Sequence, residues 1–252
     1  MTIDSHTHIN SKVLSNPLLE ISKINHCPSL SSVINIGLDI ETSKEVTDIS
    51  IQNPKFYSSV GIHPLYTENQ NIDELINLAI KTKVVAIGEI GLDYSKPNYD
   101  EQKKYLISQI IIANELHLPV IIHANNTNKE VIDVFKKVVK PLYGCVFHCF
   151  QPDLESLKYL MDNNYYISFT GRITYLNAKK SLEIARLVPS DLFLVETDSP
   201  YLSPEPIRYQ DNSSTNLHYI IKKISEIRNT SYEEIQNQST QNTLRLFKKM
   251  KK

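Results

Sequence analysis

Six residues whose side chains commonly bind metal ions lie at the carboxyl ends of short apolar runs. Two examples are the histidines of Ile-Asp-Ser-His-Thr-His and the last residue of Leu-Phe-Leu-Val-Glu-Thr-Asp. The six are His6, His8, Glu89, His123, His148 and Asp198. If the runs are parallel strands, their carboxyl ends meet at one edge. Imidazole and carboxylate groups gathered there predict a cation site.

The number of these residues favours two cations. Six protein ligands are too many for one tetrahedral catalytic ion, because such an ion keeps an open position. Two divalent ions that share a carboxylate use all six, and Glu89 is the predicted bridge. Such a pair, about 3.5–4 Å apart, activates water and stabilises the attacking and leaving oxygens. Asp198 is then expected to be both a ligand and the base for that water.

The identity of the metal stays open at the level of sequence. Mixed nitrogen and oxygen ligands suit Zn, Mn or Co, whereas the carboxylates also admit Mg. A Ser-His-Asp arrangement is not evident, because Ser199 and Pro200 follow Asp198 as a turn would.

Eight apolar, β-branched runs alternate with helical patterns along the chain. The expected strands are Thr2–Ser5, Ser32–Gly37, Tyr57–Ile62, Val84–Glu89, Val120–His123, Gly144–His148, Tyr166–Phe169 and Leu192–Glu196. The expected helices are Glu41–Gln52, Asn71–Thr82, Asn98–His117, Thr127–Val139, Asp153–Asn163, Asn177–Val188, Thr215–Arg228 and Ser231–Lys249. This pattern over 252 residues predicts a single α/β domain, 1–252, with the fold of a (β/α)8 TIM barrel. A doubly wound sheet is the competing fold, but it rarely places functional groups on five strand ends.

Strand alternation predicts which side chains face the barrel axis. His6 and His8 are two residues apart and point to one side. Glu196 should point inward one layer below Asp198, either supporting a ligand or forming a buried structural pair. The same alternation predicts that Cys149 packs outward and does not bind metal.

Bulk properties exclude several classes of protein. The net charge of −1 provides no long-range attraction for nucleic acid, so any binding of a polyanion must be local. The three cysteines are expected to be reduced, which suits a cytoplasmic protein. The N-terminus shows no basic and apolar leader, and no apolar run approaches the roughly 18 residues of a membrane span. The oligomeric state stays open, and a monomer is compatible with the sequence.

Taken together, these motifs resemble the TatD family of metal-dependent hydrolases, whose members are amidohydrolase-like TIM barrels. The matching stretches are Ile3–His8, Gly61–Pro64, Ala86–Tyr94, Leu118–His123, His148–Phe150 and Glu196–Leu202. The resemblance maps the family's metal ligands onto the six residues already identified. It implies hydrolysis of DNA phosphodiester bonds, with two divalent ions (Mg, Mn or Zn) and action on single strands or 3′ ends.

The resemblance also suggests residues around the ligands. His63 matches a position near the substrate phosphate, although a structural histidine before Pro64 is an equal alternative. Asp93 is expected to support the metal ligands without binding the metal itself. Tyr66, Tyr94 and Tyr201 can stack on bases, but surface tyrosines with solvated hydroxyls are commoner.

Four departures from the family pattern concern the substrate side of the site. An acidic residue is replaced by Asn10, and a Ser-Arg-Asp sequence after His123 is replaced by Ala124, Asn125 and Asn126. Gln151-Pro152 and the loop Arg208–Asn216 also differ. None removes a metal ligand, so the departures affect the predicted substrate more than the predicted chemistry.

Two other functions remain open. The first is another hydrolase on the same barrel, acting on a small phosphoester, lactone or amide. Many such enzymes bridge two metals with a modified lysine from the fourth strand, whereas here that strand ends in Glu89, and Lys81 and Lys83 precede it. The second is a barrel that binds without turnover, against which the intact ligand set argues.

Overall fold

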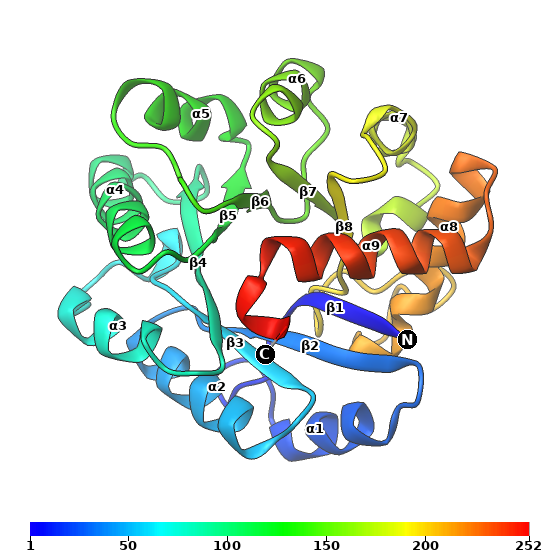
Figure 1. Ribbon diagram of the computed structural model, residues 1–252, viewed down its shortest axis with the longest axis horizontal. Coiled ribbons are helices and arrows are strands. Elements are labelled where there is room, and N and C mark those ends of the chain that lie inside the picture. The colour runs from blue at the N-terminus through cyan, green and yellow to red at the C-terminus, as the bar shows by residue number, and fades with distance from the viewer. Residues whose placement is uncertain (252) are drawn as a thin grey trace.

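Eight parallel strands form a single sheet that curls into a barrel (Figure 1). The computed structural model describes residues 1–251. The strands are β1 Thr2–Thr7, β2 Leu30–Ile36, β3 Phe56–Val60, β4 Val84–Asp93, β5 Val120–Asn125, β6 Cys145–Phe147, β7 Tyr166–Phe169 and β8 Phe193–Val195. They pair in sequence order, each parallel to the next. The predicted (β/α)8 barrel is therefore confirmed, and each expected strand overlaps an observed one.

Helices cover the outside of the barrel and cross one end of it (Figure 1). They are α1 Pro17–His26, α2 Ile40–Gln52, α3 Ile72–Ala79, α4 Tyr99–Glu115, α5 Asn128–Lys137, α6 Leu154–Asp162, α7 Lys179–Leu187, α8 Leu217–Arg228 and α9 Tyr232–Leu246. Short 3-10 helices occur at η1 Pro64–Tyr66, η2 Gly171–Thr174, η3 Ser214–Asn216 and η4 Lys248–Lys251. All eight predicted helices are present.

The first helix, α1, was not predicted from the sequence. Asn16 caps it by accepting a hydrogen bond from the Leu19 N–H, and Pro17 occupies its first turn. Ile21 and Ile24 are buried, but Leu18 and Leu19 are exposed. Apolar residues on both faces hide the helical period, so the pattern gives no clear signal here.

The strands are buried on both faces, as parallel strands beneath helices should be. Every residue of β4 is buried. Gly91 allows β5 to approach β4, because a Cβ at this position would lie 1.8 Å from the carbonyl oxygen of its partner His123. The backbone also has φ +155° there, which favours glycine.

The barrel closes between β1 and β8 with few backbone contacts. Thr7 and Ser199 form an isolated parallel bridge. The His8 N–H donates to the Ser199 carbonyl at 2.8 Å, and the Asp198 N–H donates to the His6 carbonyl at 2.9 Å. These bonds place the residues that follow β8 directly beside the end of β1.

The two ends of the barrel differ in accessibility. Helix α9 crosses the end where the strands begin: Gln236 donates to the Thr2 hydroxyl at 2.6 Å, and Asn242 donates to the Phe193 carbonyl at 2.9 Å. The other end, where the strands finish, holds the loops that carry functional groups in barrels of this type. Among the described residues, no helix is long and apolar enough to cross a membrane.

Candidate metal centre

All six residues predicted as ligands meet at the carboxyl end of the barrel. His6 lies in β1, Glu89 in β4 and His123 in β5, whereas His8, His148 and Asp198 follow strand ends. Five of them are buried, and His123 is half-buried. The closed ring brings these strand ends together, as the sequence predicted.

Four of the ligand atoms form a first cluster. His6 Nε2 lies 3.2 Å from His8 Nε2, 3.4 Å from Glu89 Oε2 and 3.6 Å from Asp198 Oδ1. His8 Nε2 lies 3.7 Å from Glu89 Oε2 and 3.3 Å from Asp198 Oδ1. Ligand atoms about 2.1 Å from a tetrahedral zinc ion are separated by roughly 3.4 Å. The spacing and the donor types therefore fit one divalent cation.

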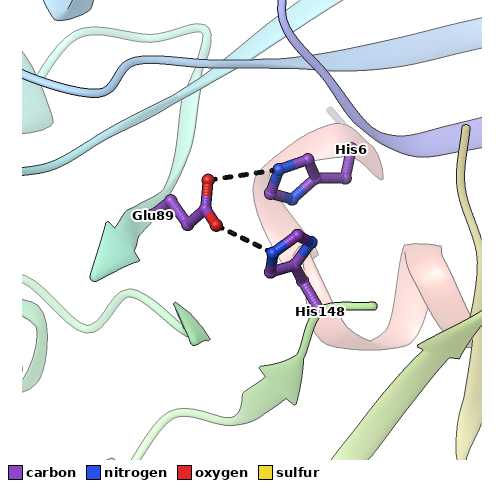
Figure 2. Close-up of side chains that lie close together, drawn as sticks. All are labelled: His6, Glu89 and His148. Atoms are coloured by element: carbon purple, nitrogen blue, oxygen red, sulfur yellow. Dashed lines mark ion pairs between the residues drawn. The ribbon is translucent and has the colours of Figure 1, made fainter. Parts of the chain in front are cut away.

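The second oxygen of Glu89 belongs to a second cluster. Glu89 Oε1 lies 2.7 Å from His123 Nδ1, 2.8 Å from His148 Nε2 and 3.6 Å from His63 Nε2. His148 Nε2 and His123 Nδ1 are 3.4 Å apart. Figure 2 shows Glu89 directing one oxygen toward His6 and the other toward His148. The carboxylate thus lies between two groups of nitrogen ligands.

Two carboxylates orient the histidines of the second cluster. Asp93 Oδ2 lies 2.9 Å from His123 Nε2, and Glu196 Oε1 lies 3.3 Å from His148 Nδ1. Each pairing fixes one ring nitrogen and leaves the other directed at Glu89, as in the carboxylate–histidine pairs behind metal ligands. Both carboxylates lie where the sequence placed supporting residues.

Burial and charge determine the protonation of the centre. Burial raises the pKa of Glu89, but the surrounding histidines lower it much further, well below its usual range. Burial lowers the pKa of His63 to about 3, and His123 lowers it as well, so His63 is a neutral imidazole. Its Nδ1 accepts a hydrogen bond from the Leu65 N–H at 3.1 Å. Burial lowers the pKa of His148, but the charges of Glu89 and Glu196 outweigh it and raise the pKa well above the usual range.

The predicted aromatic residues occupy different places. The Tyr201 ring is half exposed and meets the His8 ring edge-on at 6.0 Å, and Tyr66 lies 5.8 Å from the His63 ring. Tyr94 does not face either cluster of metal-ligating side chains. Its hydroxyl donates to Glu130 at 2.6 Å, and it lines a separate cavity of about 590 Å³ between α4 and α5.

Cys149 corrects one sequence-based prediction. It does not pack outward: the thiol lines a cavity of about 160 Å³ together with His123, His148 and Asp198. The residue has φ +42°, so the chain turns immediately after β6 and strand alternation no longer applies. The three groupings of metal-ligating side chains that the described residues form do not include Cys149. All three cysteines are free, as expected.

Arg172 lines the same cavity and was missed by the sequence analysis. It lies three residues after the end of β7, just as Asp198 lies three residues after the end of β8. The offset is counted from the observed strand ends, so the sequence pattern gave no signal for Arg172.

Comparisons with known proteins agree with this geometry. The family model described as "TatD related DNase" matches residues 3–248. The chain belongs to the TatD family. A relative in Bacillus subtilis, named as the uncharacterized metal-dependent hydrolase YabD, is 32% identical over 98% of this chain and 99% of its own. The uncharacterized metal-dependent hydrolase YcfH of Escherichia coli K12 is 31% identical over 97% and 95%.

A solved TatD homologue has the same fold. The crystal structure of YJJV from Escherichia coli K12 superimposes with a TM-score of 0.86 at 25% identity and covers 98% of each chain. The chain is therefore a TatD-type metal-dependent hydrolase with a buried cluster of histidine, glutamate and aspartate side chains able to hold metal ions.

Proposed function

We propose that this TatD-family hydrolase cleaves phosphodiester bonds of DNA, at single-stranded or 3′ ends, with two divalent cations. The observation that carries the proposal is the position of Glu89, whose two oxygens face separate clusters. His6, His8 and Asp198 would hold one cation, and His123 and His148 the other, with Glu89 between them. When bound, such a pair lowers the pKa of water and stabilises negative charge on phosphoryl oxygens.

The residues of the chain would divide the remaining work. Asp198 borders both the first cluster and the cavity, so its carboxylate can accept the proton of the attacking water. Asp93 and Glu196 hold the rings of His123 and His148 in their orientations. Tyr201 presents a half-exposed ring near His8, where a base next to the scissile phosphate can stack.

The size of the cavity supports action at strand ends. Its volume of about 160 Å³ is below the roughly 300–1,000 Å³ of sites that enclose a whole small ligand. A phosphate group can enter while the flanking nucleotides stay on the rim. The DNase description of the matching family model supports DNA as the source of that phosphate.

The proposal is tested by cleavage of a 3′-labelled single-stranded oligonucleotide. The protein is stripped of metal, and Mg, Mn or Zn is then added back singly. Shortening that returns with one of these ions and disappears in His123→Ala supports the proposal. Glu115→Gln, which changes an exposed residue on α4, serves as the control and should cleave like the parent protein.

A second candidate follows from the same small cavity. The cavity of about 160 Å³ can also admit the reactive group of a small phosphoester, lactone or amide while the rest of the compound stays on the rim. Turnover of such a compound, with no cleavage of the oligonucleotide under any of the three ions, would favour this alternative.

A further inference from the structure

A cavity of about 160 Å³ opens beside the second cluster, and one arginine side chain lines it. His123, His148 and Asp198 contribute its metal-centre side. Asn125, Gln151 and Arg172 are polar groups of its remaining wall, and Arg172 is the only lysine or arginine among the lining residues. An anion that entered this cavity would therefore meet the Arg172 guanidinium.

The Arg172 side chain is free to bind such an anion. It is exposed, and within residues 1–251 its guanidinium forms no hydrogen bond or ion pair. Other cations near this end of the barrel are engaged. Lys12 pairs with Asp39, and Arg208 lies 3.4 Å from Glu205 and stacks on the Tyr175 ring at 4.1 Å. Arg172 thus keeps its full set of donors for a ligand.

The wall near Asn125 is occupied by neutral amides. Gln151 Nε2 donates to Asn125 Oδ1 at 2.8 Å, and Asn125 Nδ2 donates to Asp93 Oδ1 at 3.1 Å. Gln151 Oε1 accepts from the Asn126 N–H at 3.0 Å. These amides satisfy one another and carry no charge. Asp93 and Asp198 are acidic, so beside the metal centre Arg172 is the one lysine or arginine of the lining that can attract an anion.

We propose that Arg172 binds the phosphate of the substrate and selects anionic phosphodiesters over uncharged esters. The assignment rests on the proposed function of the adjacent metal centre. The planar guanidinium can donate two parallel hydrogen bonds to phosphate oxygens. Arg172 is a substrate-binding residue in this scheme, and Asp198 remains the base.

Binding of inorganic phosphate to the metal-reconstituted protein tests the assignment without turnover. Isothermal titration calorimetry should show that Arg172→Gln weakens phosphate binding roughly tenfold, the loss expected for one charged hydrogen-bonding group. Arg172→Lys keeps the charge but loses the bidentate geometry, so its phosphate affinity should lie between those of the parent protein and Arg172→Gln. Arg186→Gln removes the same charge from the exposed surface of α7 and should match the parent protein. Equal affinities for Arg172→Gln and Arg186→Gln would overturn the assignment.

A substrate comparison separates this inference from the proposed function. With a single-stranded oligonucleotide, Arg172→Gln should raise KM roughly tenfold and leave kcat little changed, because the contact is made before and during the reaction. With uncharged p-nitrophenyl acetate, KM should not change. If Arg172→Gln loses phosphate binding but the parent protein cleaves no DNA, the DNase proposal is refuted and Arg172 remains an anion-binding residue. If the parent protein cleaves DNA and Arg172→Gln does so with an unchanged KM, the DNase proposal stands and the role of Arg172 is refuted.

Discussion

The Asp4 carboxylate on β1 accepts two hydrogen bonds from Thr197, the residue before Asp198. The Thr197 N–H lies 2.9 Å from Asp4 Oδ1, and the Thr197 hydroxyl lies 2.5 Å from Oδ2. Asp4 is fully buried, and its Oδ1 also accepts from the His6 N–H at 3.3 Å. One side chain therefore positions the two segments that carry His6, His8 and Asp198, across the seam where backbone pairing is sparse.

Asp4→Asn should loosen this seam and weaken metal binding. The amide keeps one acceptor oxygen but leaves a buried donor of Thr197 without a partner, which costs about 1–3 kcal/mol of unfolding free energy. Chemical denaturation of the metal-free protein measures this loss. Competition with a chelator should also show weaker binding of one ion per chain.

Asp191→Asn is the matched control for that variant. Asp191 is exposed, so the same substitution there should change neither stability nor metal affinity. A positioning role for Asp4 would be wrong if Asp4→Asn lost stability yet bound both ions with parental affinity.

Glu89→Gln tests whether one carboxylate serves both clusters. Glutamine keeps the size of the side chain but has one carbonyl oxygen and no charge, so it cannot supply an anionic ligand to each side. We expect metal content to fall from two ions per chain to one or none and turnover to be lost, and we expect the same loss of turnover for Glu89→Ala. Elemental analysis gives the content, and circular dichroism checks the fold. Two retained ions with normal turnover would refute the bridging role.

The convergence of the six side chains was predictable because each lies on a strand or within three residues of a strand's carboxyl end. In parallel strands, side chains alternate with a period of two and all carboxyl ends lie at one edge. His6, Glu89 and His123 could therefore be placed together from sequence. The supporting carboxylate Glu196 followed from the same alternation, whereas Asp93 was suggested by the resemblance to the family.

Features that depend on loops were not predictable in this way. The chain turns at Cys149 immediately after β6, so alternation failed there. Tyr94 follows β4 beyond an irregularity in its pairing with β5, and its hydroxyl bonds to Glu130 on α5 instead of facing the clusters. Arg172 reaches the cavity through the short helix η2, whose path is not encoded in a strand pattern.

Asp93→Asn should weaken one metal site while sparing the other. The substitution removes the negative charge that lies 2.9 Å from His123 Nε2. Replacing carboxylates behind metal ligands typically costs about 10–100-fold in affinity. Stepwise metal titration should therefore show one weakened ion and one unchanged ion. Equal weakening of both ions would instead indicate a general change in the fold.

Metal affinity should fall as the pH is lowered. Burial lowers the pKa of His123 and His148, but neighbouring carboxylates outweigh it and raise both above their usual value. In the absence of metal these rings therefore hold protons near neutrality, and a cation must displace them to bind. The logarithm of affinity should change by about one unit per pH unit for each proton released. Chelator competition between pH 6 and 8 measures the slope, and a flat profile would contradict protonated ligands.

Asp198→Asn should separate metal binding from proton transfer. Asparagine retains an oxygen that can face His6 and His8, and Glu89 is untouched, so at least one ion per chain should remain bound. The amide cannot accept the proton from water, and loss of a general base typically lowers rate by roughly 10²–10⁴-fold. We therefore expect kcat for the oligonucleotide to collapse while KM changes little, because Arg172 and the second cluster still engage the phosphate. Single-turnover kinetics with matched metal content provide the measurement. A rate close to that of the parent protein would move the base to another residue.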